Sequence, residues 1–121
     1  MVKALFDTNI LIDYLNGVPA ARNELGLYEG KAISIVTWME VLAGASPKTE
    51  AVIRAFLDDF EVIALDDRIA EHAVSFRKSH KLKLPDAIIW ASAQANAMLL
   101  VTRNTKDFPA TDPGVRVPYV V

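Results

Sequence analysis

The sequence predicts an α/β fold with a central, mainly parallel sheet of four to five strands and helices on both of its faces. Short apolar runs, such as 2–6, 32–36 and 98–101, alternate along the chain with longer segments whose apolar residues recur at helical spacing. Glycine, proline, asparagine and aspartate stand between these segments and mark turns. Parallel strands need right-handed crossovers, which bring helices onto both faces of a sheet.

Composition supports one globular domain over 1–121. The chain has 121 residues, 52% of them hydrophobic, and no cysteine, which excludes disulfides, thiolate zinc sites and cysteine nucleophiles. Its most apolar stretch, 87–101, is interrupted by Ser92, Gln94 and Asn96, and no signal peptide is recognisable. We therefore expect a cytoplasmic protein with no membrane segment. The formal net charge of −2 does not by itself indicate a nucleic-acid binder.

The first half of the chain contains two expected strands. A strand over 2–6 leads into a helix over 10–15, which ends at the Gly17 and Pro19 breakers. A second helix is expected over 20–28, and the β-branched run 32–36 predicts the second strand. A helix capped by Thr37 follows and ends near Gly44.

The second half continues the alternation. Ser46 followed by Pro47 predicts the start of a helix over 47–60, with an apolar stripe formed by Val52, Ile53, Phe56, Leu57 and Phe60. A third strand over 61–65 precedes a helix capped by Asp66 or Asp67. The remaining expected elements are a helix from Leu84 that is apolar on nearly all sides, a strand over 98–101 and a short fifth strand over 115–121.

Four carboxylates fall where strands end or helices begin. Asp7 follows the first strand, Glu40 lies in the helix after the second, Asp86 starts the apolar helix, and Asp107 follows the fourth strand. The carboxyl ends of parallel strands meet at one edge of a sheet, where ligands bind. We therefore expect these acids to converge there.

Each of these acids also has a structural interpretation. Glu40 stands three residues after Thr37, as in a capping box, and Asp86 after Pro85 suits a helix N-terminus. Asp107 fits an exposed turn before Pro109. Asp7 is the hardest to explain structurally, because a charge at the end of a buried strand is costly unless it is paired or liganded. Asp13, by contrast, is expected on the polar side of the first helix.

Clustered carboxylates repel one another unless a cation neutralises them. An oxygen-rich site without histidine favours Mg²⁺ or Mn²⁺ over Zn²⁺. One such ion, or two, would support hydrolysis of a phosphodiester by a metal-activated water. A dense basic run, Arg77, Lys78, His80, Lys81 and Lys83, precedes Asp86 and is either a solvated helix end or a phosphate-binding patch.

Four stretches, in order, resemble the sequence motifs of PIN domains, and in particular of VapC-type ribonuclease toxins from toxin–antitoxin pairs. They are 5–12 (LFDTNILI), 37–40 (TWME), 84–87 (LPDA) and 100–108 (LVTRNTKDF). Any one of them alone is a weak signal, whereas the set covers nearly the whole chain. The resemblance implies a three-layer α/β/α PIN-like fold.

The same resemblance implies an Mg²⁺- or Mn²⁺-dependent endoribonuclease whose acidic site is carried by Asp7, Glu40 and Asp86. At the fourth position many relatives have an aspartate where this chain has Asn104, with another acid three residues on, which is Asp107 here. The resemblance leaves open which of these two completes the site. It also implies an RNA substrate, a VapB-type antitoxin as partner and a homodimer.

Four side chains belong to the expected site as substrate-binding or supporting residues. They are Thr8, Asn9, Arg103 and Asn104, and a phosphate contact is expected for Arg103. Two alternatives remain open: a non-catalytic PIN-fold module that binds RNA or protein, and a phosphatase with Asp7 as nucleophile. The phosphatase fits less well, because such sites have a second aspartate where this chain has Asn9.

Overall fold

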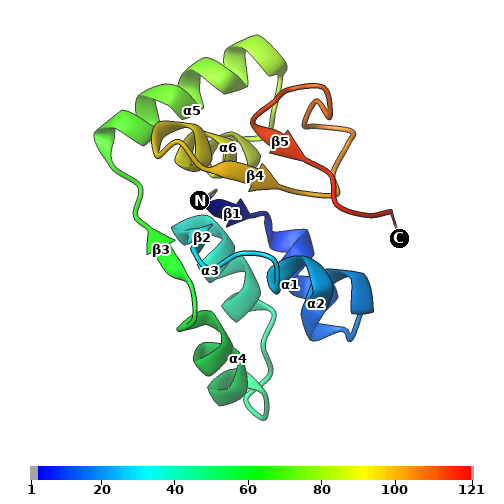
Figure 1. Ribbon diagram of the computed structural model, residues 1–121. Helices are drawn as coiled ribbons and strands as arrows, with labels where there is room; N and C mark the ends of the chain where they lie inside the picture. Colours follow the sequence, from blue (N-terminus) through cyan, green and yellow to red (C-terminus); the bar gives the residue numbers. More distant parts are fainter. Residues whose placement is uncertain (1–2, 121) are drawn as a thin grey trace.

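Five strands form one parallel sheet in a computed structural model that describes residues 3–120. The strands lie in the order β3-β2-β1-β4-β5 (Figure 1). Their bounds are β1 Ala4–Phe6, β2 Lys31–Ser34, β3 Glu61–Ile63, β4 Leu99–Val101 and β5 Val115–Arg116, and every pairing between them is parallel. The predicted α/β class and strand number are confirmed. Val2 and Val121, which the expected first and fifth strands include, lie outside the described residues.

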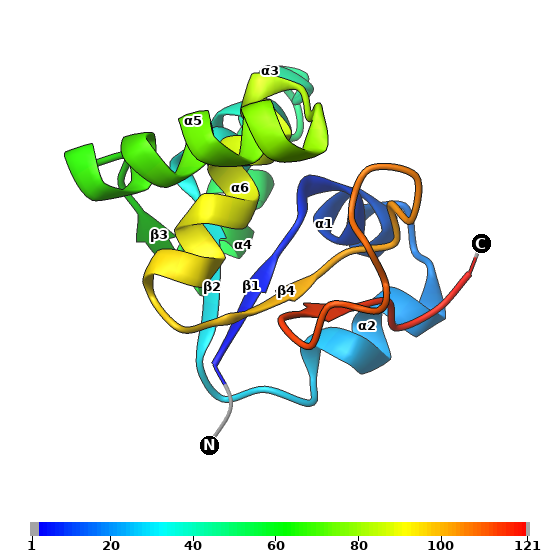
Figure 2. The ribbon, with the colours of Figure 1, turned by 90° about the horizontal axis from the view of Figure 1, so that it is seen from above.

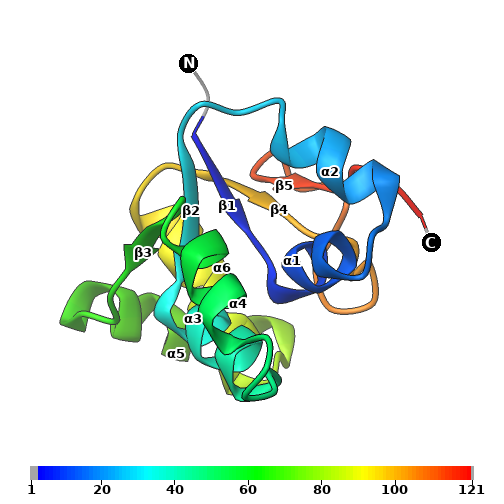
Figure 3. The same cartoon turned by 90° about the horizontal axis from the view of Figure 1, so that it is seen from below.

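Helices cover both faces of this sheet (Figures 1 and 3). One face packs against α5 (Asp67–His80) and α6 (Leu84–Ala95) around the buried side chains of Leu5 and Leu100. The other packs against α1 (Thr8–Leu15), α2 (Pro19–Leu25) and α4 (Glu50–Leu57) around Phe6 and Ile33. The predicted three-layer arrangement is confirmed. Within residues 3–120, no helix combines the length and apolar composition that crossing a bilayer requires.

Helix α6 is buried on most sides, as its composition predicts. Ala87, Ala91 and Ala93 are at most 1% exposed, and their small side chains let the helix approach the sheet closely. Trp90 stacks on Phe76 of α5 with 4.3 Å between ring centroids, which joins the two helices. Asp66 caps α5 by accepting a hydrogen bond of 2.8 Å from the backbone amide of Ile69, so the first of the two predicted caps is the correct one.

The boundary between β2 and α3 (Ile35–Ala43) differs from the prediction. Ser34, not Thr37, is the N-cap, and its hydroxyl accepts a hydrogen bond of 3.1 Å from the Val36 amide. Ile35 and Val36 have the β-branched side chains of a strand, but a serine cap outweighs that weak preference. Thr37 is fully buried inside the helix. The capping-box interpretation of Glu40 is therefore wrong, because Glu40 lies in the second turn.

Several other predicted elements are longer than the observed ones. Helix α4 begins at Glu50 rather than at Pro47, because Ser46 and Thr49 close a turn through their hydroxyl and backbone groups. In this register Val52 points outward and is 70% exposed, so it does not belong to the apolar stripe. The second helix ends at Leu25, β3 at Ile63 and β5 at Arg116, each earlier than predicted.

The strand order places a crevice beside β1. The chain proceeds from β1 to β2 and β3 on one side, then returns to place β4 and β5 on the other. The connections leaving β1 and β4 therefore diverge at their carboxyl ends, which is where α/β sheets bind ligands. Figure 2 shows α1, α3, the start of α6 and the loop after β4 gathered at this end.

Candidate active site

Asp7 lies at the carboxyl end of β1 and is 4% exposed. It is also the N-cap of α1, because its Oδ1 accepts a hydrogen bond of 2.8 Å from the Thr8 amide. Its Oδ2 accepts hydrogen bonds from the Thr102 hydroxyl at 2.7 Å and from Asn9 Nδ2 at 3.2 Å. The carboxylate is therefore held in one orientation by donors from both strands that border the crevice.

The pKa of Asp7 is raised to about 6, chiefly because burial disfavours the ionised form. The hydrogen bonds from Thr102 and Thr8 oppose this effect, and the negative charges of Asp86 and Glu40 add to it. Each unit of difference between the pKa values of the unfolded and folded states corresponds to about 1.4 kcal/mol. Ionisation of Asp7 at neutral pH therefore lowers the free energy of unfolding by about 3 kcal/mol. A bound cation would remove this cost.

Glu40 of α3 is connected to the β1 end through Thr8. Its Oε1 accepts a hydrogen bond of 2.6 Å from the Thr8 hydroxyl, which itself lies 3.0 Å from the hydroxyl of buried Thr37. Glu40 remains exposed. Thr8 and Thr37 together position a carboxylate that is otherwise free to move into the solvent.

Asp86 enters the crevice from the first turn of α6 and is partly buried. Burial raises its pKa, and the charges of Asp107 and Glu40 raise it further, while Lys83 lowers it. Among residues 3–120 no group donates a hydrogen bond to its carboxylate. Asp86 therefore differs from Asp7 in having its oxygens available to a ligand.

Asn104 and Asp107 form a closed pair in the loop after β4. Asn104 Nδ2 donates a hydrogen bond of 2.9 Å to Asp107 Oδ2, and the Asp107 amide donates one of 3.2 Å to Asn104 Oδ1. Asn104 lines the crevice, whereas Asp107 stands behind it, near enough to raise the pKa of Asp86. The neutral amide thus holds the acid in place, and the two residues act together.

One open cleft of about 350 Å³ brings most of the predicted site residues together. It is lined by Asp7, Thr8, Asn9, Ile12, Glu40, Asp86, Arg103 and Asn104. Three lining side chains are carboxylates and one is a cation, so the cleft is acidic. Within residues 3–120, however, no three acidic or histidine side chains lie close enough together to form a metal-binding cluster.

The donor set nevertheless suits a hard divalent cation. All candidate ligands are carboxylate oxygens, which Mg²⁺ and Mn²⁺ prefer, and no histidine or cysteine competes. Two of the acids have pKa values raised by burial and by neighbouring negative charges, and a bound divalent cation would relieve both effects. The residues fit such an ion by their chemistry and by sharing one cleft.

Arg103 and Asp13 form an ion pair beside the cleft that the sequence did not predict. Arg103 Nε and Nη2 lie 2.6 and 3.0 Å from the two Asp13 oxygens, and the Tyr119 hydroxyl donates a third hydrogen bond at 2.9 Å. Asp13 is 5% exposed, so its placement on the polar side of α1 was wrong. The hydrogen bond from Arg103 is the main reason why the pKa of Asp13 is lowered.

Two residues important to the cleft were missed in the sequence. Thr102 orients Asp7, and Thr37 supports Thr8. A signal for Thr102 existed, since it follows β4 as Asp7 follows β1, and Phe6 is paired with Val101 in the sheet. Thr37 gave no such signal, because its role depends on α3 starting earlier than its sequence suggests.

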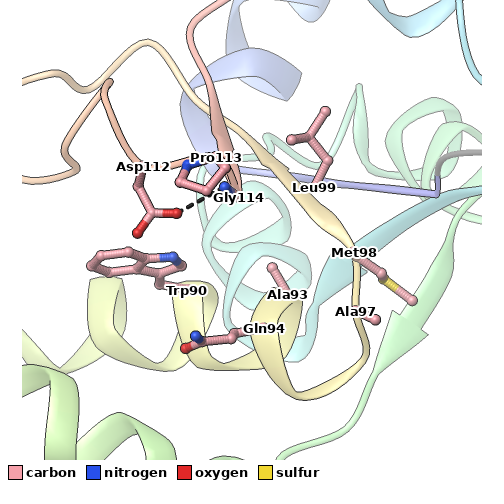
Figure 4. A pocket seen from close by; sticks show the side chains of 9 residues that line it. All are labelled: Trp90, Ala93, Gln94, Ala97, Met98, Leu99, Asp112, Pro113 and Gly114. Atoms are coloured by element: carbon pink, nitrogen blue, oxygen red, sulfur yellow. Dashed lines mark hydrogen bonds between the residues drawn. The ribbon is translucent and has the colours of Figure 1, made fainter.

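A second hollow, of about 440 Å³, lies at the end of the sheet opposite the acidic cleft, where β4 begins (Figure 4). Trp90, Met98 and Leu99 supply most of its apolar lining. Asp112, the one ionisable residue among the described residues that line it, accepts a hydrogen bond of 2.7 Å from the Gly114 amide in an Asp-Pro-Gly turn. Gln94 and Asp112 are the polar side chains among its described lining residues, whereas three carboxylates and one arginine line the acidic cleft, which is therefore the candidate active site.

The fold and the site define a class of protein: an α/β protein with a parallel sheet and an acidic cleft where the strand order reverses. This chain can therefore be compared with known families of that class. The family model described as "PIN domain" matches residues 4–112. The chain therefore belongs to the PIN-domain family, as its four motifs indicated.

Similar proteins come from several bacteria. Ribonuclease VapC10 of Mycobacterium tuberculosis is 31% identical over 97% of this chain and 93% of its own length. A chain of a toxin–antitoxin complex from Klebsiella pneumoniae is 49% identical, with a TM-score of 0.93 over 98% of this chain and 100% of its own. A chain of DNA-bound VapBC from Salmonella typhimurium is 27% identical, with a TM-score of 0.80 over 96% of each chain.

The raised pKa of Asp7 predicts a specific pH dependence of stability. The folded-state value of about 6 lies above the model value of 3.8, so the folded state binds the proton more tightly. The free energy of unfolding should therefore fall as the pH rises from about 4 to about 7. Asp7→Asn cannot ionise and should lose less stability over this range. Urea denaturation at a series of pH values, in the presence of a chelator, measures the free energy of unfolding, and the exposed-site variant Asp58→Asn is the control. Parallel curves of unfolding free energy against pH for the wild type and Asp7→Asn would contradict the prediction.

The Asp13–Arg103 pair predicts a large effect on stability. Asp13→Ala leaves Arg103 and Tyr119 without their shared acceptor and should lower the free energy of unfolding by about 3 kcal/mol. The control is Glu50→Ala, which removes an exposed pair with Arg54 and should cost under about 0.5 kcal/mol. Urea midpoints give both values, and equal midpoints for the two variants would show that the partly buried Asp13–Arg103 pair contributes no more than the exposed Glu50–Arg54 pair.

Proposed function

We propose that this chain is a metal-dependent endoribonuclease and the toxin of a VapBC-type toxin–antitoxin pair. The observation that carries the proposal is the cleft in which Asp7, Glu40 and Asp86 converge from three elements at the switch point of the sheet. Membership of the PIN-domain family and similarity to a relative named as a ribonuclease support it.

The residues proposed to hold Mg²⁺ or Mn²⁺ are Asp7, Glu40 and Asp86, with Asp107 as the fourth acid of the site. Such an ion, when bound, supplies Lewis acidity that neutralises charge on a phosphodiester and makes water a stronger nucleophile. This role explains why three carboxylates occupy one cleft despite their repulsion.

The remaining cleft residues have roles in positioning. Thr8 fixes Glu40, while Asn9 and Thr102 fix Asp7. Arg103 is the one cation among the lining residues. Since Asp13 occupies its Nε and Nη2, its Nη1 side is the part proposed to contact an RNA phosphate.

Asn104 is proposed to act by holding Asp107 rather than by binding metal itself. Its amide bonds both the side chain and the backbone of Asp107, which fixes a negative charge near enough to act on Asp86 electrostatically. This arrangement favours Asp107 as the residue that completes the site. The neutral Asn104 is therefore compatible with catalysis.

The proposed partners are a VapB-type antitoxin and a second copy of the chain. Two similar structures carry the words toxin–antitoxin complex or VapBC in their descriptions. Met39, next to Glu40 in α3, and Val52 of α4 are exposed apolar side chains, at 51% and 70%. They offer contact area to such a partner.

Loss of RNA cleavage in Asp7→Asn is the main test. The variant keeps the size of the side chain but removes its charge. The rate of RNA cleavage in Mg²⁺ or Mn²⁺ should fall at least about 100-fold, which corresponds to a loss of roughly 3 kcal/mol of transition-state stabilisation. Glu29→Gln, at an exposed acid far from the cleft, should keep wild-type activity. Wild-type protein that cuts cellular RNA no better than Asp7→Asn would overturn the proposal.

Metal binding can be measured separately from cleavage. Mn²⁺ at about 100 times its dissociation constant should stabilise the wild type by about 2.7 kcal/mol, since a ligand that binds only the folded state stabilises it. Asp86→Asn should gain much less, and a chelator should reverse the gain. If the wild type gains nothing yet binds RNA tightly, the non-catalytic binding module is the better interpretation.

A further inference from the structure

The cations of this chain are unevenly distributed. Of 13 lysine and arginine residues, four form ion pairs with acids: Lys3, Arg54, Arg103 and Arg116. Among the residues that the structure describes, none of the other nine forms such a pair. Four of those nine, Arg77, Lys78, Lys81 and Lys83, lie within seven residues at the junction of α5 and α6. This junction leads directly into the turn that carries Asp86.

The α5–α6 junction is held firmly by its own contacts. Leu82 is 1% exposed and anchors the junction in the core. Arg77 Nη1 donates a hydrogen bond of 2.7 Å to the Leu82 carbonyl, and the Lys81 amide donates one of 3.1 Å to the Arg77 carbonyl. Lys81 and Lys83, on either side of Leu82, are both exposed. Their backbone positions are thus fixed while their ammonium groups reach into solvent.

Lys81 occupies a backbone conformation that favours glycine. Its φ of 55° lies in the left-handed region at the C-cap of α5, where glycine is the common residue and a Cβ is unfavourable. Gly17 fills the comparable position after α1, with φ of 80°. A lysine at such a site sacrifices stability and places a charge there, and strain of this kind is often associated with function.

An RNA strand needs this charge because the cleft itself is acidic. Each nucleotide brings a negative phosphate, and three carboxylates line the cleft. Lys83 caps α6 within one helical turn of Asp86, near enough to act on that carboxylate electrostatically. In Figure 2 the end of α5 and the start of α6 lie at the same end of the molecule as α1 and the loop after β4.

We propose that Lys81 and Lys83 form a phosphate-binding site for single-stranded RNA, which holds the strand beside the acidic cleft. The inference rests on the proposed ribonuclease function and adds a binding site outside the cleft. Lysine suits this use, because a mobile ammonium on a long side chain binds phosphates of any sequence. The site would therefore contribute affinity and leave base preference to other residues.

Lys81→Gly distinguishes this role from a structural one. Glycine relieves the left-handed strain, so the urea midpoint should rise, yet RNA affinity should fall about three- to tenfold. Lys83→Ala should cause a similar loss of affinity. Binding of labelled poly(U) is measured in full-length protein that also carries Asp7→Asn, so that cleavage does not interfere. Each lysine removed should reduce the slope of log affinity against log salt by about 0.7.

Ala97→Gly is the matched control. Ala97 has a φ of 53° and is exposed, but it lies at the opposite edge of the sheet, between α6 and β4. This substitution should also raise the urea midpoint, and it should leave poly(U) affinity and its salt slope unchanged. The comparison separates relief of strain from loss of charge.

Unchanged poly(U) affinity in both Lys81→Gly and Lys83→Ala would overturn the inference. Equal affinity for duplex DNA, lost equally in the lysine variants, would overturn single-stranded RNA as the occupant. Neither result depends on catalysis. If the wild type fails to cleave RNA while the lysine variants still lose poly(U) affinity, the proposed enzymatic function fails and the binding site stands. In the active protein the lysine variants should raise KM for RNA.

Discussion

The buried charge of Asp7 is the constraint on which the carboxyl edge of this sheet depends. A carboxylate at 4% exposure is unfavourable when ionised, and Asp86 and Glu40 make it more so. Hydrogen bonds from Thr8, Asn9 and Thr102 hold it in place without supplying positive charge. The protein thus keeps a destabilising group in a fixed orientation, as is common where a site must bind a cation or catalyse a reaction.

Positive charge around the cleft comes from side chains in different environments. Arg103 is held by buried Asp13, which also accepts a hydrogen bond from the Tyr119 hydroxyl, so its guanidinium is fixed in position and partly neutralised. Lys81 and Lys83 have no acidic partner within the described residues and are exposed at the α5–α6 junction. A fixed cation suits the positioning of a reacting group, whereas mobile lysines suit the retention of a polymer. The two kinds of charge therefore complement each other around one acidic cleft.

The loop after β4 connects these features. Its Thr102 bonds to Asp7, Arg103 pairs with Asp13 of α1, and Asn104 holds Asp107, whose charge acts on Asp86. Three successive residues thus contact three parts of the site. The Asp13–Arg103 pair fixes this loop to α1, so a stabilising interaction also sets the geometry of the cleft. Stability and site organisation are not separable here.

The sequence by itself determined the succession of strands and helices along the chain, the position of Asp7 after β1 and the start of α6 at Leu84. Local apolar periodicity and helix caps carry this information. It could not give the start of α3, where the Ser34 cap outweighed β-branched neighbours. Only the tertiary structure decided that Asp13 meets Arg103, 90 residues away, and that Thr102 meets Asp7. Such contacts arise from the strand order, which places β4 beside β1, and no local pattern encodes that neighbour.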